Sequence, residues 1–163
     1  MTTNAAAGFD FLLGSWTVHN RKILDNTDPE CDEWIEFDAH STVVPILLGA
    51  GNLERMIVSE PVDGDPFEGV SLRIFDPASG TWGIWWSSTR SPGKLEVPVR
   101  GEFDGNTGRF ECDDVVGGVP VRTRFEWTVG PSPRWQQSFS YDNELTWSTN
   151  WTMTFERNSP TMA

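Results

Sequence analysis

Few side chains in this 163-residue chain have the types and spacing that covalent or acid–base chemistry requires. His19 and His40 are the only histidines, and alternation places both on outward strand faces, where they form no triad or ligand set. Cys31 and Cys112 are far apart and lie outside any Cys-x-x-Cys pattern, which argues against a zinc site or a disulfide framework. We therefore predict no metal site and no defined catalytic residues.

Some acids and one thiol keep enzymatic chemistry open. Asp114 and Cys112 share a strand face, on which they would supply an interior acid and a nucleophile, although an acid near a strand end is more often solvated. A general acid or base needs an interior position and a shifted pKa. Asp114, His40 or Glu54 lining the interior would favour an enzyme.

Arg73 is the one arginine whose orientation changes the functional interpretation. It lies between Leu72 and Ile74, so simple alternation predicts that it points into solvent. A β-bulge that reversed the register would instead make it the best anion anchor in the interior.

The elements that must position these groups are β-strands. Apolar and polar residues alternate with a period of two, and turns rich in Gly, Pro, Asp and Asn recur about every dozen residues. An even number of strands in up-and-down order lets the last pair with the first, which predicts an all-β, ten-stranded antiparallel closed barrel. The predicted strands are Ser15–Leu24, Asp32–Val44, Asn52–Glu60, Glu68–Phe75, Thr81–Thr89, Val97–Phe103, Gly108–Val116, Val119–Val129, Arg134–Tyr141 and Trp147–Glu156.

The composition limits the classes of partner that the protein is expected to bind. The net charge of −12 opposes binding to nucleic acid, and 12 of the 24 acids fall between Asp25 and Glu68, which predicts an electronegative side or rim. The N-terminus has no signal-peptide pattern, and no apolar run is long enough to span a membrane. We expect one cytoplasmic domain over residues 1–163 that contacts neither nucleic acid nor membrane and can form a homodimer.

Alternation also predicts which side chains face the interior. In the last strand, Trp147, Thr149, Trp151, Met153 and Phe155 are predicted inside. The inner sets of other strands include Val70, Leu72 and Ile74, and Trp135, Gln137, Phe139 and Tyr141. By this pattern seven of the nine tryptophans face inward: Trp16, Trp82, Trp86, Trp127, Trp135, Trp147 and Trp151.

Seven inward indoles are more than the closed end of a barrel needs as a plug. A ten-stranded barrel is also wider than an eight-stranded one, so its interior has room for a guest. Some are expected to form core and others a stacking wall for a planar or apolar guest, oriented by a few polar atoms. The predicted ligand-binding residues are Asn20, Trp86, Phe125, Trp127, Gln137, Phe139, Trp151 and Met153.

An arginine near the end of the chain forms a sequence pattern together with residues at the start of the first strand. Gly14-x-Trp16 is followed, near the end of the chain, by Arg157, placed where its guanidinium would stack on the indole and plug the closed end. This pairing resembles the lipocalin signature. The segments FDFLLGSWTVHNRK, GNLE, LRIFDPASGTWGIWW and RWQQSFSYDNELTWSTNWTMTFER resemble a bacterial family of lipocalin-like (calycin) domains of largely uncharacterised function, over most of the chain.

The resemblance implies a fold and no reaction. Haem-binding barrels of the nitrobindin type, a related calycin group, need an interior axial histidine near the end of the chain, and the closing strands here contain none. We therefore expect neither haem nor another cofactor.

Three functions follow from these patterns. The first is binding of a small hydrophobic or aromatic molecule in the barrel cavity. The second is a cofactor-independent cyclase, isomerase or hydrolase that acts on a small hydrophobic substrate in the same cavity, since fold does not decide function. The third is an interaction module with a filled barrel and an acidic face.

Overall fold

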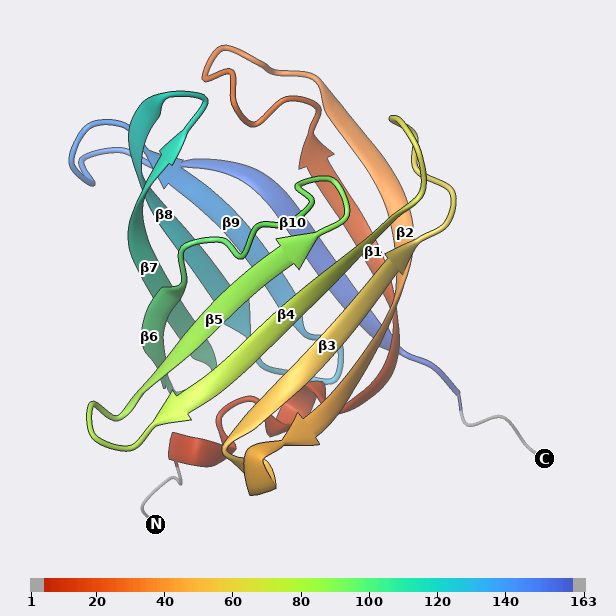
Figure 1. The fold of residues 1–163 in the computed structure, drawn as a ribbon, viewed down its shortest axis with the longest axis vertical. Coiled ribbons are helices and arrows are strands. Elements are labelled where there is room, and N and C mark those ends of the chain that lie inside the picture. Colours follow the sequence, from red (N-terminus) through yellow and green to blue (C-terminus); the bar gives the residue numbers. More distant parts are fainter. Residues whose placement is uncertain (1–4, 160–163) are drawn as a thin grey trace.

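Ten antiparallel strands close into one barrel, as the alternation predicts (Figure 1). The computed structural model describes residues 5–159, so both ends of the predicted 1–163 domain lie outside the described residues. Three short 3₁₀ helices accompany the strands at Ala5–Ala7 (η1), Asp10–Leu12 (η2) and Leu47–Gly49 (η3). The strands are β1 (Gly14–Ile23), β2 (Trp34–Ile46), β3 (Gly51–Val58), β4 (Phe67–Asp76), β5 (Thr81–Ser88), β6 (Val99–Asp104), β7 (Thr107–Val116), β8 (Val119–Thr128), β9 (Arg134–Ser140) and β10 (Ser148–Arg157).

Each strand pairs with its neighbours in sequence, and β1 also pairs with β10, so the sheet has no free edge. The strand limits agree with the predicted ones to within about two residues. Among residues 5–159, no helical segment has the length and apolar character that a membrane span requires.

The closed end of the barrel is plugged by the segment that precedes β1. Phe9 is buried inside the barrel, with its ring centroid 5.0 Å from Trp82 and 4.9 Å from Phe103, both in edge-to-face geometry. Leu12 is also fully buried, and its carbonyl oxygen accepts a hydrogen bond of 2.7 Å from the Trp16 indole. Aromatic packing of this kind fixes the plug against the strands.

Arg157 holds the plug from the other side, and the predicted stacking is confirmed. Its guanidinium carbon lies 4.1 Å from the Trp16 ring centroid, and Nη1 donates to the Leu13 carbonyl oxygen at 2.9 Å. Gly14 is required here, because its φ is +122° and a Cβ would lie only 2.6 Å from that same Nη1. The Gly-x-Trp pattern therefore lets the chain turn under the arginine.

Three tryptophans lie outside the barrel rather than two. Trp147 was predicted inside, but a bulge between Thr149 and Trp151 shifts the register, so Asn150 is buried and Thr149 pairs with outward-facing Ser138. Trp147 instead stacks on the exterior against Arg124, whose guanidinium carbon is 3.7 Å from the ring centroid. The prediction for Trp147 and Thr149 was wrong because the alternation of apolar and polar residues does not reveal a β-bulge.

One further prediction at an end of the barrel was wrong. Tyr141 lies beyond the last residue of β9 and is exposed, not inside. The apolar stretch 43–51 turns through η3 at the closed end and does not line the cavity described below. Leu48 in that turn is fully exposed.

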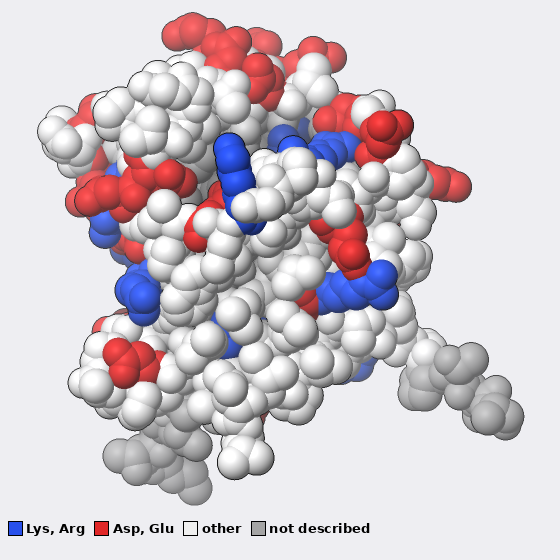
Figure 2. All heavy atoms as spheres, in the orientation of Figure 1, with Lys and Arg blue, Asp and Glu red and all other residues white. Residues whose placement is uncertain are grey.

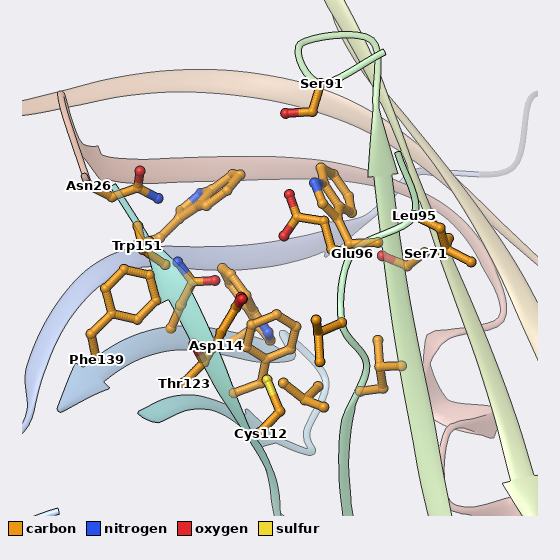
Figure 3. Close-up of a pocket in the computed structure, with 18 of the residues that line it drawn as sticks. Asn26, Ser71, Ser91, Leu95, Glu96, Cys112, Asp114, Thr123, Phe139 and Trp151 are labelled. Carbon is orange, nitrogen blue, oxygen red and sulfur yellow. The ribbon is translucent and has the colours of Figure 1, made fainter. Parts of the chain in front are cut away.

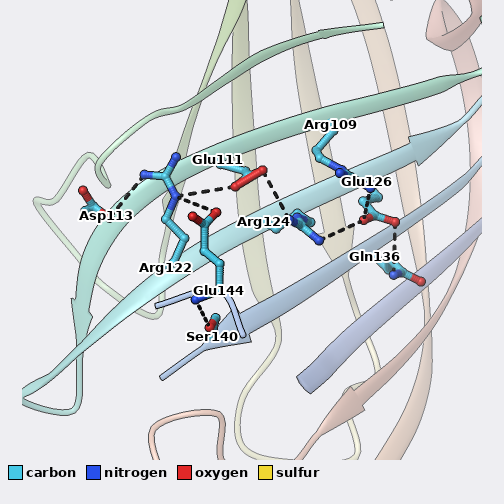
Figure 4. A network of polar contacts seen from close by, with 9 residues as sticks. All are labelled: Arg109, Glu111, Asp113, Arg122, Arg124, Glu126, Gln136, Ser140 and Glu144. Atoms are coloured by element: carbon cyan, nitrogen blue, oxygen red, sulfur yellow. Dashed lines mark hydrogen bonds and ion pairs between the residues drawn. The ribbon is translucent and has the colours of Figure 1, made fainter. Parts of the chain in front are cut away.

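A ladder of alternating charges covers the outer face of β7, β8 and β9 (Figure 4). Arg122 and Arg124 on β8 face outward, and both pair with Glu111 on β7 at 3.5 Å. Arg124 also reaches Glu126. Such part-exposed pairs each contribute little, so the ladder serves mainly to keep this wall solvated and in register.

The closed-end contact generates a stability prediction. Replacing Arg157 by Ala removes the stacking on Trp16 and the hydrogen bond to the plug, and should lower the free energy of unfolding by about 1–2 kcal/mol in denaturant titrations. Arg134→Ala on the exposed side of β9 is the control, with an expected change within about 0.5 kcal/mol. Equal losses in the two variants would contradict the plugging role.

Candidate functional site

A cavity of about 860 Å³ lies inside the barrel. Figure 3 shows side chains that line it. This volume lies within the range of small-molecule sites. Seven of the eight predicted ligand-binding side chains line it: Trp86, Phe125, Trp127, Gln137, Phe139, Trp151 and Met153.

Asn20, the eighth predicted residue, is fully buried but is not among the lining residues. Its Oδ1 accepts a hydrogen bond of 2.9 Å from the Trp151 indole, and its Nδ2 donates to the Val18 carbonyl oxygen at 3.2 Å. Asn20 therefore orients the wall through Trp151 instead of facing the cavity itself.

The wall is a chain of aromatic rings in edge-to-face contact. Ring centroids are 6.4 Å apart between Trp86 and Trp151, 5.5 Å between Trp151 and Trp135, and 5.0 Å between Trp135 and Phe125. This geometry fixes each ring through its neighbour. The rings come from β5, β8, β9 and β10, so the wall extends around much of the barrel.

Gly69 on β4 makes room for one of these rings. A Cβ at this position would lie 2.0 Å from Cη2 of Trp86, so the indole rests directly over the β4 backbone. Any larger residue would push the Trp86 ring into the cavity or off the wall.

Uncharged polar side chains lie beside the aromatic rings of the wall. Gln137 donates from Nε2 to Oδ1 of Asn150 at 2.8 Å, and Asn150 reaches the interior because of the bulge in β10. Thr123 lines the cavity on β8, opposite Cys112 on β7. The sequence pattern found Gln137 and missed Asn150.

The floor of the cavity is a buried ion pair. The Arg73 guanidinium donates to the Glu54 carboxylate from Nη2 and to Asn52 Oδ1 from Nη1 at 3.0 Å. Ser41 donates to the other oxygen of Glu54. The Arg73 side chain is 2% exposed and that of Glu54 5%, so each charge depends on the other for compensation.

Below the pair, the guanidinium carbon of Arg73 lies 5.3 Å from the ring centroids of both Phe9 and Trp127. Arg73 thus separates the aromatic packing of the plug from the open cavity above it. Its positive charge faces ring π-systems on one side, which is a favourable arrangement in a desolvated site.

The predicted orientation of β4 was wrong. Phe67, Gly69, Ser71 and Arg73 face inward, whereas Val70, Leu72 and Ile74 are only half-buried on the outside. No bulge is involved, because β4 pairs with both neighbours without a register shift. The outer face is itself apolar here, since Leu72 lies between Leu53 on β3 and Trp85 on β5, so apolar alternation marked the wrong face.

Three buried polar atoms at the cavity lack a hydrogen-bond partner among residues 5–159. They are Nε of Arg73, Nε1 of Trp127 and Oγ1 of Thr123. All three side chains line the cavity. A buried polar atom left unsatisfied costs about 1–3 kcal/mol, so each of these three atoms calls for a partner beyond the described residues.

Two carboxylates lie towards the open end. Glu96, in the segment between β5 and β6, and Asp114 on β7 both line the cavity (Figure 3). Glu96 is solvent-exposed at the rim, and partial desolvation of its carboxylate, reinforced by the nearby Asp114 charge, raises its pKa above the ordinary value. The sequence pattern identified Asp114 but not Glu96, because segment 89–98 is irregular and shows no alternation.

Cys112 is a buried thiol on the same wall. Burial, with a smaller effect of Asp114, raises its pKa to about 11. At neutral pH it is therefore a thiol and not a thiolate, and it is poorly suited to act as a nucleophile.

Both histidines are exposed on the outer face, as predicted. His19 lies between Glu36 and Asp38, with ring-nitrogen distances of 3.0 and 2.9 Å to their carboxylates, and these hydrogen bonds raise its pKa. His40 does not line the cavity. Within the described residues, no group of three His, Cys, Asp or Glu side chains is arranged to hold a metal ion.

No family model matches the chain, and no curated protein matches it.

The floor ion pair generates the first site prediction. Arg73→Met leaves the buried Glu54 carboxylate without its cation and should reduce the free energy of unfolding by about 3–5 kcal/mol. The double variant Arg73→Met/Glu54→Gln removes both charges, so it should be clearly more stable than the single variant in the same denaturant titration. A double variant no better than Arg73→Met would show that the pair does not compensate the buried charge.

The second site prediction concerns thiol reactivity. With Cys31 replaced by Ser, alkylation of Cys112 by iodoacetamide at pH 8 should be more than about tenfold slower than alkylation of Cys31 in a Cys112→Ser variant, because a pKa near 11 leaves little thiolate. Mass spectrometry of timed aliquots measures both rates. Comparable rates would mean that Cys112 is neither buried nor perturbed.

Proposed function

We propose that this protein binds a small hydrophobic or aromatic molecule in the barrel cavity. The supporting observation is the cavity of about 860 Å³ itself, whose wall carries a continuous chain of aromatic rings. A guest in such a site is held by buried area and ring contacts, each good aromatic contact adding about 0.5–1.5 kcal/mol beyond burial, while one or two polar atoms set its orientation. The same volume argues against the alternative of a filled barrel.

The chain is further proposed to be a lipocalin-like (calycin) barrel with a distant relation to the nitrobindin type. The closed ten-stranded barrel is compatible with this assignment, and the stacking of Arg157 on Trp16 supports it. The proposed homodimer is supported by apolar side chains exposed on the outside of β2 and β3, Val44 and Leu53, which are paired in register.

An enzyme acting on the same class of molecule is the second candidate. The observation that favours it is the raised pKa of Glu96 beside Asp114 at the cavity, an arrangement suited to general acid–base catalysis. Glu54 also lines the cavity, but its carboxylate is held by Arg73 and Ser41. Turnover that is lost in Glu96→Gln while binding persists would separate catalysis from binding.

The binding proposal predicts quenching of tryptophan fluorescence by an uncharged polyaromatic dye such as Nile red. Six of the nine tryptophans are inside the barrel, so saturating dye should quench much of the intrinsic emission. Trp151→Ala should weaken binding by about three- to tenfold, since it removes a ring of the wall.

Trp34→Ala is the matched control, because Trp34 stacks on Arg21 outside the barrel, and it should bind the dye as the unaltered protein does. Gln137→Leu should change the preference among guests more than stability. The proposal fails if no compound in a chemically varied apolar panel changes the tryptophan fluorescence.

A further inference from the structure

We propose that the guest is a neutral carbonyl compound, such as an aromatic ketone, whose oxygen sits at the cavity floor and accepts hydrogen bonds from Arg73 Nε and Trp127 Nε1. This inference rests on the proposed binding function and names the chemical class of its ligand. It is carried by two buried polar atoms that the protein itself does not satisfy.

Both atoms can only donate. An arginine Nε and an indole Nε1 each carry one N–H and offer no lone pair to a donor, so their missing partner must be an acceptor. Arg73 is 2% exposed and Trp127 3%, and neither atom has a partner within residues 5–159. Bulk solvent therefore has little access to them.

The two side chains are neighbours at the same end of the cavity. The guanidinium carbon of Arg73 lies 5.3 Å from the Trp127 ring centroid, and both residues line the cavity. Nη1 and Nη2 donate to Asn52 and Glu54, which orients the guanidinium, and Nε is its one nitrogen without a partner among residues 5–159. A carbonyl oxygen has two lone pairs and suits two such donors.

Charge argues for a neutral acceptor. The positive charge of Arg73 is already balanced by Glu54, so an anionic guest would place two buried negative charges against one positive charge. Glu96 and Asp114 add two negative charges along the cavity and Lys94 adds one positive charge, so the upper lining is also net negative. Acidic side chains also gather around the open end of the barrel (Figure 2), where the loops 24–33 and 59–66 connect the strands, and they oppose the entry of anions.

The cavity walls determine which kind of molecule the carbonyl group can belong to. Above the floor lie Met56, Ile84 and Met153 together with the aromatic chain of Trp86 and Trp151, which favour an apolar, planar body. A ketone, ester or quinone attached to one or two aromatic rings combines both requirements.

The test compares three naphthalene probes of nearly equal size: 2-acetylnaphthalene, 2-ethylnaphthalene and 2-naphthoate. Binding is measured by equilibrium dialysis, because all three probes absorb at the wavelengths of tryptophan and would interfere with a fluorescence titration. The ketone is expected to bind at least about fivefold more tightly than the ethyl compound, the effect of one buried hydrogen bond, and the carboxylate more weakly than the ketone.

Trp127→Phe keeps the ring and removes the Nε1 donor, so it should reduce the preference for the ketone over the ethyl compound at least severalfold. Trp34→Phe on the outside is the matched control and should leave that preference unchanged. A second measurement does not depend on the variant folding well: the carbonyl stretch of ¹³C-labelled 2-acetylnaphthalene should shift to lower frequency in the bound state than in hexane.

The outcomes separate this inference from the binding function. Equal affinity for the ketone and the ethyl compound, a carbonyl stretch as in hexane, or an unchanged preference in Trp127→Phe would overturn the carbonyl assignment while binding stands. Tighter binding of 2-naphthoate would overturn the requirement for a neutral guest. If none of the three probes binds, the proposed function itself fails.

Discussion

The buried ion pair between Arg73 and Glu54 is the interaction on which the interior depends. Two charges this deeply buried are tolerated only when paired, so β3 and β4 must place them side by side on the inner face. The pair divides the barrel in two. Beneath it the plug packs Phe9 against the rings of Trp82 and Phe103, and above it the lumen stays open.

Features at both ends follow from this division. At the closed end, Arg157 stacks on Trp16 and donates to the plug, so the aromatic cluster below the floor is held from both sides. Above the floor, a wall of rings and a few unsatisfied donors face a cavity whose entrance is ringed by acids (Figure 2). The same side chain of Arg73 thus completes the core and forms the base of the candidate site.

Much of this could be predicted from the sequence, because strands alternate with a strict period and turns carry recognisable residues. The strand limits, the closure and most of the wall followed from that pattern. Arg73 did not, since β4 has apolar residues on its outer face and the alternation was assigned to the wrong side. Trp147 and Asn150 were misassigned because of one bulge, and Glu96 was missed because its segment is irregular. These errors occur where pairing partners, not local periodicity, decide orientation.

The central claim is that a small apolar molecule binds inside the barrel, above the floor. The most direct measurement is a ¹H–¹⁵N spectrum of the nine indole groups during titration with 2-ethylnaphthalene, with each signal assigned by a Trp→Phe variant. The account predicts that the signals of the cavity tryptophans move, namely Trp86, Trp127, Trp135 and Trp151, while those of the external Trp34, Trp85 and Trp147 stay in place. Movement confined to the external indoles, or none at all, would contradict it.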